Sequence, residues 1–308
     1  MSGTPTSPVR RGRRSAACAN CGSALGGPYC AACGQLDAPL DPTVRELAAD
    51  AAQEMLGVDG KLLSTARLLL HPGRLTVDYL AGRRAAHVGP VRIYLACSAL
   101  LFALLALQPP MARPKRRDEF RMFGMAAISI DVPDSVATRL AHAPHPSLPE
   151  RALLRVRAAV RAGPERHAEM EQRTVNAIPQ AFFLMVPAYA AAMWLVAPRP
   201  RRHFPAHLCY ALHVHAFAFT ALAGVLAVRL AVKQVADTSS VPALNALVLL
   251  LFAAVGSAVL AYTFVAFRRV YGATWAGAAT RIIGSTALYF ILLGVALLVI
   301  MAAVLLFG

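Results

Sequence analysis

Five long stretches without a charged side chain constrain this chain more than any other feature. Each is long enough to cross a bilayer, since a transmembrane helix needs about 17–25 predominantly apolar residues. They occupy residues 93–112, 174–198, 206–228, 242–267 and 282–308. The composition agrees, because 57% of residues are hydrophobic and only 15% are charged, against roughly 25% charged in soluble domains. We predict an all-α integral membrane helical bundle of about five spans, the lipid bilayer being its first partner.

The charged residues lie between these stretches. The chain has a formal net charge of +15, but its arginines flank apolar segments, which is typical of membrane proteins and not of nucleic-acid-binding surfaces. Two short loops are basic, and short basic loops favour the cytosolic side. Their arginines are Arg199, Arg201 and Arg202 after the second stretch, and Arg268, Arg269 and Arg281 around the loop after the fourth. The predicted topology therefore places the N-terminus in the cytosol and the C-terminus outside.

The segment at residues 113–173 is an external loop in this topology. It begins with four basic residues, Arg113, Lys115, Arg116 and Arg117, which conflicts with an external position. Long loops are translocated largely regardless of charge, so the conflict does not exclude the assignment. Residues 149–173 alternate charged and apolar residues and predict one or two amphipathic helices.

Four of the six cysteines lie close together, at Cys18, Cys21, Cys30 and Cys33. The preceding residues 1–17 are small, polar and basic and lack an apolar signal core, so we expect a disordered leader in a reducing cytosol, where metal ligation is favoured over disulfides. Two Cys-x-x-Cys-Gly knuckles at residues 18–35 predict a zinc ribbon, with Zn²⁺ held by all four thiolates in a structural role. A redox dithiol, an iron–sulfur cluster and a metal-free state are the alternatives.

Residues 36–91 predict short amphipathic helices on the cytosolic side. Asp41 and Pro42 are typical of a helix start, and further helical segments run from Lys61 to Leu70 and from Leu75 to Ala81. They suit either the membrane surface or a small soluble subdomain. Residues 92–308 form the membrane domain.

Polar residues within the apolar stretches are candidates for function, because an unpaired polar group is costly in hydrocarbon. The candidates are His207, His213, His215 and Asn245. Neutral histidines bonded to neighbouring helices are one interpretation, and metal or proton handling is the other. His213 and His215 lie about 200° apart around a regular helix, so they cannot share one ion. Arg268, Arg269 and Tyr271, which follow the fourth stretch, anchor the chain at the cytosolic face or contact a lipid headgroup or partner.

The order of these features resembles a known bacterial family. The ribbon CANCGSALGGPYCAACGQ, the stretch HPGRLTVDYLAGRR before the first span, and the later runs HLCYALHVHAF and FRRVYGATW are similar to the membrane proteins grouped as domain of unknown function 3667. This resemblance implies an N-terminal zinc ribbon and a multi-span membrane region. We expect the chain to lie in the bacterial inner membrane. It implies no catalytic residues.

The chain contains no Gly-x-Ser-x-Gly, His-Glu-x-x-His or phosphate-binding Walker motif, so no enzyme class is indicated. We therefore expect a non-enzymatic adaptor or regulator whose ribbon binds a cytosolic protein partner. The alternative is a transporter of small solutes or ions that uses the polar residues of spans two to four.

Overall fold

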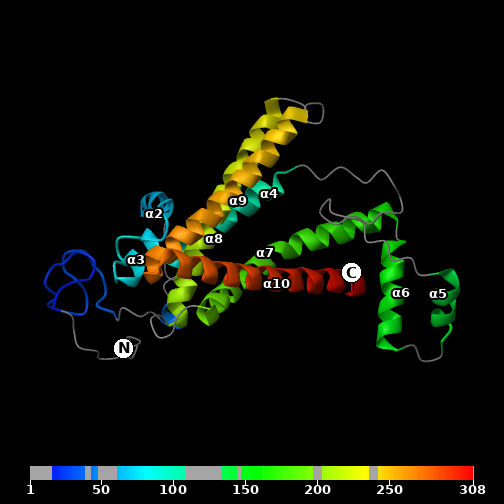
Figure 1. Cartoon of the computed structure of the whole chain (residues 1–308), viewed down its shortest axis with the longest axis horizontal. Coiled ribbons are helices and arrows are strands. Elements are labelled where there is room, and N and C mark those ends of the chain that lie inside the picture. Colours follow the sequence, from blue (N-terminus) through cyan, green and yellow to red (C-terminus); the bar gives the residue numbers. More distant parts are fainter. Residues whose placement is uncertain are drawn as a thin grey trace, which may run out of the picture. The chain divides into compact units, whose positions relative to one another are not determined.

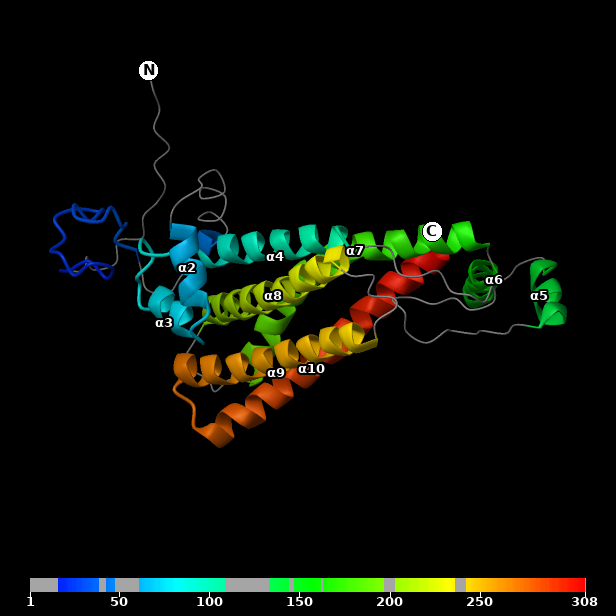
Figure 2. The ribbon, with the colours of Figure 1, turned by 90° about the horizontal axis from the view of Figure 1, so that it is seen from above.

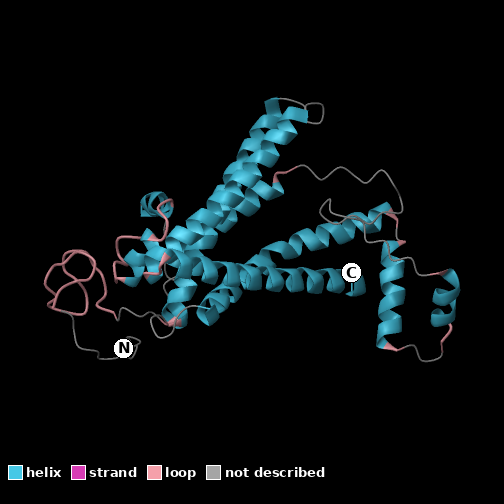
Figure 3. Cartoon of the chain, viewed as in Figure 1, coloured by secondary structure: helices cyan, strands magenta, loops and turns pink. Residues whose placement is uncertain are grey.

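The structure is a computed structural model and describes residues 16–38, 43–47, 61–108, 133–143, 147–161, 163–196, 203–235 and 242–307. Within these ranges the extended regular structure is helical, and two isolated β-bridges lie in the N-terminal segment (Figure 3). Its helices are α2 Lys61–Leu69, α3 Arg74–Leu80, α4 Pro90–Ala106, α5 Asp134–Ala141, α6 Leu148–Val160, α7 Pro164–Val196, α8 Phe204–Val235, α9 Pro242–Tyr271 and α10 Trp275–Phe307 (Figure 1). The predicted all-α fold class is confirmed.

The chain divides into two compact units. The first comprises Met1–Leu107 and Tyr189–Thr286, and the second comprises Gln108–Ala188 and Ala287–Gly308.

In the first unit α4, α8 and α9 pack side by side, with α8 between the other two (Figure 2). Aromatic side chains fill both contacts of α8. Phe219 lies 5.6 Å from Tyr94 of α4 between ring centroids, and Phe217 stacks on Tyr262 of α9 at 3.8 Å. More than half of the apolar stretch of α8 is buried, compared with 11% for α9. The core of this unit is therefore built around α8.

Helices α2 and α3 begin and end within one residue of their predicted bounds, and both pack on the bundle. The turn between them rests on α9. Gly73 has φ +70°, and a Cβ atom there would lie 2.9 Å from both the Cα and the carbonyl oxygen of Ala266. The Tyr262 hydroxyl donates to the Leu69 carbonyl at 2.9 Å, and Arg269 donates to the Pro72 carbonyl. This pair of helices is thus part of the bundle and not a separate subdomain.

Among the described residues, three helices are long and apolar enough to cross a membrane: Phe204–Val232 of α8, Ala246–Tyr271 of α9 and Trp275–Val304 of α10. Two shorter apolar helical stretches, Pro90–Ala106 and Ala181–Val196, fall within or beside the first two predicted spans. Helix α7 starts at Pro164 and also includes residues that the sequence assigned to the loop. Helix α10 likewise begins before its predicted span and includes Arg281. Charges limit an apolar stretch, but they do not stop a helix, which explains both differences.

The second unit contains α5, α6, most of α7 and the larger, C-terminal part of α10. Asp134 at the start of α5 accepts hydrogen bonds from Arg157 and Arg161, which joins α5 to α6. An apolar groove of about 820 Å³ lies between α7 and α10, and its lining includes Leu184 and Leu292. The predicted amphipathic helices of the loop correspond to α6 and the first turns of α7.

A capping interaction lies close to the start of the first predicted helix. The backbone N–H of Glu46 donates to the hydroxyl of Thr43 at 3.1 Å, and the backbone N–H of Thr43 donates to the Glu46 carboxylate at 2.9 Å. This reciprocal pair is a capping box. Asp41 and Pro42, the predicted start, lie outside the described residues.

Candidate metal centre

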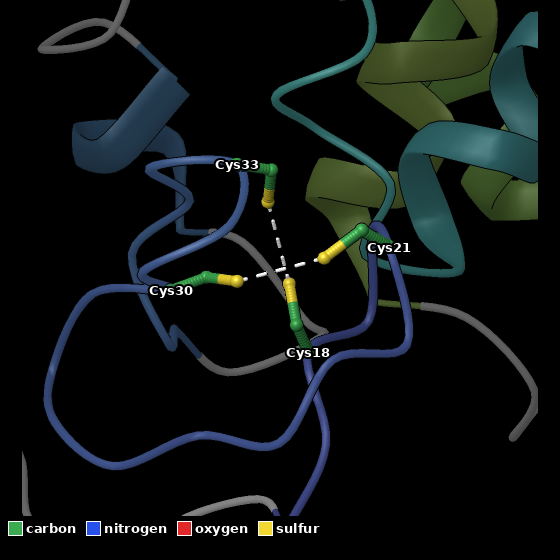
Figure 4. Close-up of side chains that lie close together, drawn as sticks. All are labelled: Cys18, Cys21, Cys30 and Cys33. Carbon is green, nitrogen blue, oxygen red and sulfur yellow. Dashed lines mark hydrogen bonds between the residues drawn. The ribbon is translucent and has the colours of Figure 1, made fainter.

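The sulfur atoms of Cys18, Cys21, Cys30 and Cys33 converge on one point (Figure 4). The Cys18 and Cys33 sulfurs lie 3.6 Å apart and those of Cys21 and Cys30 lie 3.5 Å apart. All four lie within 4.8 Å of one another. A tetrahedral ion with bonds of about 2.3 Å to sulfur places its ligands roughly 3.8 Å apart. The cluster therefore fits one metal ion without rearrangement of its backbone.

The two knuckles that present these sulfurs are built in the same way, twelve residues apart. In the first, Cys18 N–H donates to the Ser23 carbonyl at 2.8 Å and Gly22 N–H donates to the Cys18 carbonyl at 2.9 Å. In the second, Cys30 N–H donates to the Gln35 carbonyl and Gly34 N–H donates to the Cys30 carbonyl, both at 2.8 Å.

The glycine of each knuckle occupies a backbone conformation that side chains rarely adopt. Gly22 has φ +78° and Gly34 has φ +74°. The glycines predicted from the Cys-x-x-Cys-Gly pattern are thus needed for the turn itself.

The thiols have unequal acidity. Hydrogen bonds from the side chain and then the backbone of Ser23 lower the pKa of Cys21 to about 6. The Cys33 backbone N–H lowers the pKa of Cys30. Burial and the neighbouring Cys21 sulfur raise this pKa by more, so that it lies at about 11. Thiolates as close together as these sulfurs repel one another unless a cation offsets their charge. The chemistry of this donor set therefore also favours a bound metal ion.

Four protein ligands complete a tetrahedral coordination shell. No position is left for a water molecule or substrate, which is the arrangement of structural and not catalytic metal sites. Ser23, which contacts the Cys21 sulfur, was not recognised from the sequence. Its position directly after a knuckle glycine is the only signal that could have identified it.

The predicted intramembrane polar residues contact different partners. His207 Nδ1 lies 2.7 Å from the Tyr271 hydroxyl, His213 Nδ1 lies 2.9 Å from the Thr76 hydroxyl, and His215 Nδ1 lies 2.8 Å from the Ala211 carbonyl. All three histidines are buried. Asn245 lies in the first turn of α9. The structure thus connects the histidines to separate neighbours and does not gather them into one site.

One nitrogen among these groups has no partner within the described residues. It is Nε2 of His213, in a side chain that is only 2% exposed. Thr76 of α3 bonds the other nitrogen of this ring. The hydroxyl of Thr76 was not recognised from the sequence, since nothing in its local pattern connects it to a residue 137 positions away.

Arg268, Arg269 and Tyr271 act within the bundle. The Arg268 guanidinium lies 3.6 Å from the ring centroid of Trp275, and its Nε donates to the Ala273 carbonyl. Arg269 bonds the α2–α3 turn, and Tyr271 stacks on His207 at 5.4 Å between centroids. These contacts join the end of α9 to α2, α8 and α10.

The fold and the cysteine cluster define a helical protein of membrane type with an N-terminal four-cysteine site that could hold a metal ion. Residues 59–102 match the family model described as protein of unknown function, DUF3667. This match confirms the resemblance over residues 59–102, which cover α2, α3, most of α4 and the HPGRLTVDYLAGRR stretch. No curated protein and no solved structure matches the chain.

Proposed function

We propose that this chain is a non-enzymatic adaptor or regulator of the bacterial inner membrane, whose zinc ribbon binds a protein partner in the cytosol. The observation that carries the proposal is an asymmetry between the two otherwise equivalent knuckles. The β-bridge of the second knuckle pairs Tyr29 with Leu36, whereas that of the first pairs Ala17 with Ala24. Tyr29 is 62% exposed and Leu36 is 44% exposed. One knuckle therefore presents two large apolar side chains that its equivalent lacks.

The charge of the ribbon favours a protein as the partner. Residues 18–35 contain no lysine, arginine, aspartate or glutamate. Binding to nucleic acid or to anionic headgroups depends on cationic side chains that neutralise phosphates. Exposed aromatic and aliphatic side chains on an uncharged surface instead provide the apolar anchors that protein interfaces use.

Zinc is the proposed metal. Four thiolates in tetrahedral arrangement suit Zn²⁺ or iron and exclude hard cations such as Mg²⁺. Metal analysis of the purified protein should give about one zinc per chain, falling to none in a Cys18→Ser, Cys21→Ser double variant. Iron with acid-labile sulfide, or a full zinc complement in the double variant, would reject the assignment.

The partner can be tested with a photo-crosslinking amino acid at Tyr29 in cells, and at Ala17 as the matched position of the other knuckle. We expect one protein to be captured at Tyr29 and not at Ala17. The purified partner should bind the full-length chain in detergent, and a Tyr29→Ala, Leu36→Ser variant that retains its zinc should bind at least tenfold more weakly. Undiminished binding by this variant, or full complementation of a deletion strain by a gene lacking residues 1–35, would contradict the adaptor role.

A transporter is the second candidate, favoured by the buried Nε2 of His213. Transport through α8 would need a polar route that water enters at this depth. A cysteine at His213 should then react with a membrane-impermeant thiol reagent, measured at that site by mass spectrometry. An unreactive cysteine there would leave the adaptor role as the supported one.

A further inference from the structure

The side chain of Gln35 joins the ribbon to the turn between α3 and α4. Its Nε2 donates to the Gly82 carbonyl at 2.7 Å. Its Oε1 accepts from the backbone N–H groups of Arg84 at 3.0 Å and Ala85 at 2.9 Å. One amide side chain therefore satisfies three backbone groups of a segment almost fifty residues away in the sequence.

The two amides differ in how much they depend on Gln35. Arg84 N–H also lies 3.0 Å from the Gly82 carbonyl, so it has a second acceptor. Ala85 N–H has no second acceptor among the hydrogen bonds of the described residues. The Ala85 amide is thus the cleaner reporter of this contact.

Gln35 is held in place by the second knuckle. It follows Gly34, and its own carbonyl accepts the N–H of Cys30 that shapes the knuckle. A module of this size buries too little apolar surface to fold alone, and its folding free energy comes largely from metal binding. The position of the Gln35 side chain therefore depends on the occupied metal site.

The turn that Gln35 binds leads directly into the first apolar helix. Arg83 forms an ion pair with Asp78 of α3, and Val88 N–H donates to the Thr65 hydroxyl of α2 at 3.1 Å. Helix α4 begins at Pro90. Residues 82–85 are thus the point where the ribbon, α3 and the entry to α4 meet.

We infer that Gln35 is a metal-dependent latch, which fixes residues 82–85 at the entry to α4 while the four cysteines hold a metal ion and releases them when the metal is lost. Binding or loss of the metal ion thereby changes how firmly the entry to α4 is held. The latch requires neither a partner protein nor zinc in particular, so it goes beyond the adaptor role and can fail or hold independently of it.

Hydrogen exchange of the full-length chain in detergent micelles tests the latch at the Ala85 amide. Removing the metal with a chelator should accelerate exchange at Ala85 about tenfold, because the opened turn loses three hydrogen bonds. A Gln35→Ala variant should show the same acceleration while its metal content stays at the wild-type level. Trypsin should then also cleave faster after Arg83 and Arg84.

Two further variants separate the latch from general damage to the ribbon. Leu25 follows the Ala17–Ala24 bridge of the first knuckle and takes no part in the Gln35 contact, so metal-loaded Leu25→Ala should leave Ala85 exchange unchanged. Gln35→Glu keeps an acceptor for the Ala85 amide but loses the donor to Gly82, and should give an intermediate rate. Unchanged Ala85 exchange in metal-loaded Gln35→Ala, or after metal removal from the wild type, would overturn the inference.

Discussion

At the scale of single residues, a buried hydrogen bond between Thr76 and His213 joins α3 to α8. Both side chains are at most 2% exposed. Replacing Thr76 by valine keeps the shape but leaves the His213 Nδ1 without its partner. A buried unsatisfied group costs about 1–3 kcal/mol, and we expect a loss of that size in the free energy of unfolding, measured by denaturant titration in detergent. Thr76→Ser keeps the hydroxyl and should lose less. A larger loss in the serine variant than in the valine variant would show that the methyl group and not the hydrogen bond matters.

A second prediction at this scale concerns Gly73. A comparison with Gly272 separates the cost of a positive φ from the cost of close packing. Gly73 and Gly272 both have positive φ, +70° and +62°, but only Gly73 has backbone atoms within reach of an added Cβ. Gly272→Ala should cost about 1–2 kcal/mol of unfolding free energy through the left-handed conformation alone. Gly73→Ala should cost about 1–3 kcal/mol more, since overpacking against Ala266 is added. Equal losses would mean that the α2–α3 turn can move away from α9 without penalty.

The candidate site itself was accessible to sequence reasoning because its geometry is local. Cys-x-x-Cys spacing and a following glycine determine how each knuckle presents two thiolates, and the structure brings all four sulfurs together. Gln35 was not recognised as a contact to Gly82, since the sequence between them does not encode which turn lies beside the ribbon. The partners of His207 and His213 are missing from sequence reasoning for the same reason.

At the scale of elements, α6 begins with a capping interaction outside the apolar stretches. The backbone N–H and the hydroxyl of Ser147 donate to the Glu150 carboxylate at 2.7 and 2.8 Å, and these bonds lower the pKa of Glu150. A carboxyl with a lowered folded-state pKa stabilises the helix above its unfolded pKa, and this contribution is lost as the pH falls through the lowered value. Glu150→Gln should therefore accelerate amide exchange in the first turn of α6 at neutral pH by a few-fold.

The pH dependence provides the check on this explanation. The difference in exchange between Glu150→Gln and the wild type should shrink below about pH 4, where the protonated carboxyl resembles the amide. Glu165→Gln in the first turn of α7 is the control and should leave α6 unchanged. A difference that persisted at low pH would assign the effect to side-chain shape and not to charge.

Helix starts were less predictable than helix existence. Thr43 with Glu46 and Ser147 with Glu150 both follow the Ser/Thr-x-x-Glu pattern of a capping box, and both pairs form in the structure. Asp41 and Pro42, the start predicted from the sequence, lie outside the described residues, so that start stays a prediction. Two start signals next to each other cannot be ranked without knowing which carboxylate reaches which backbone N–H.

At the scale of the whole molecule, the structure and the apolar stretches agree that α8, α9 and α10 can span a membrane. Two topologies remain, which differ in whether α4 and α7 also cross it. Helix α4 has 17 residues, or about 25 Å at 1.5 Å per residue, somewhat less than the roughly 30 Å of a hydrocarbon core. The apolar part of α7, Ala181–Val196, is equally short. If both cross the membrane there are five spans, and if neither does there are three. Apolar length alone cannot decide, because short helices are accommodated by local thinning of the bilayer.

The position of Glu150 decides between these topologies, whereas the C-terminus does not. With a cytosolic N-terminus, either three or five spans place Gly308 outside, and both keep Arg199 and Arg268 on the cytosolic side as the positive-inside rule requires. Only five spans place Glu150 outside. We predict that an alkaline phosphatase fusion, which is active only outside the cytosol, is active at Glu150 and at Gly308, and that a fusion at Arg199 is inactive. Activity at Gly308 with cytosolic reporter signal at Glu150 would instead establish three spans, with α4 and α7 on the cytosolic side.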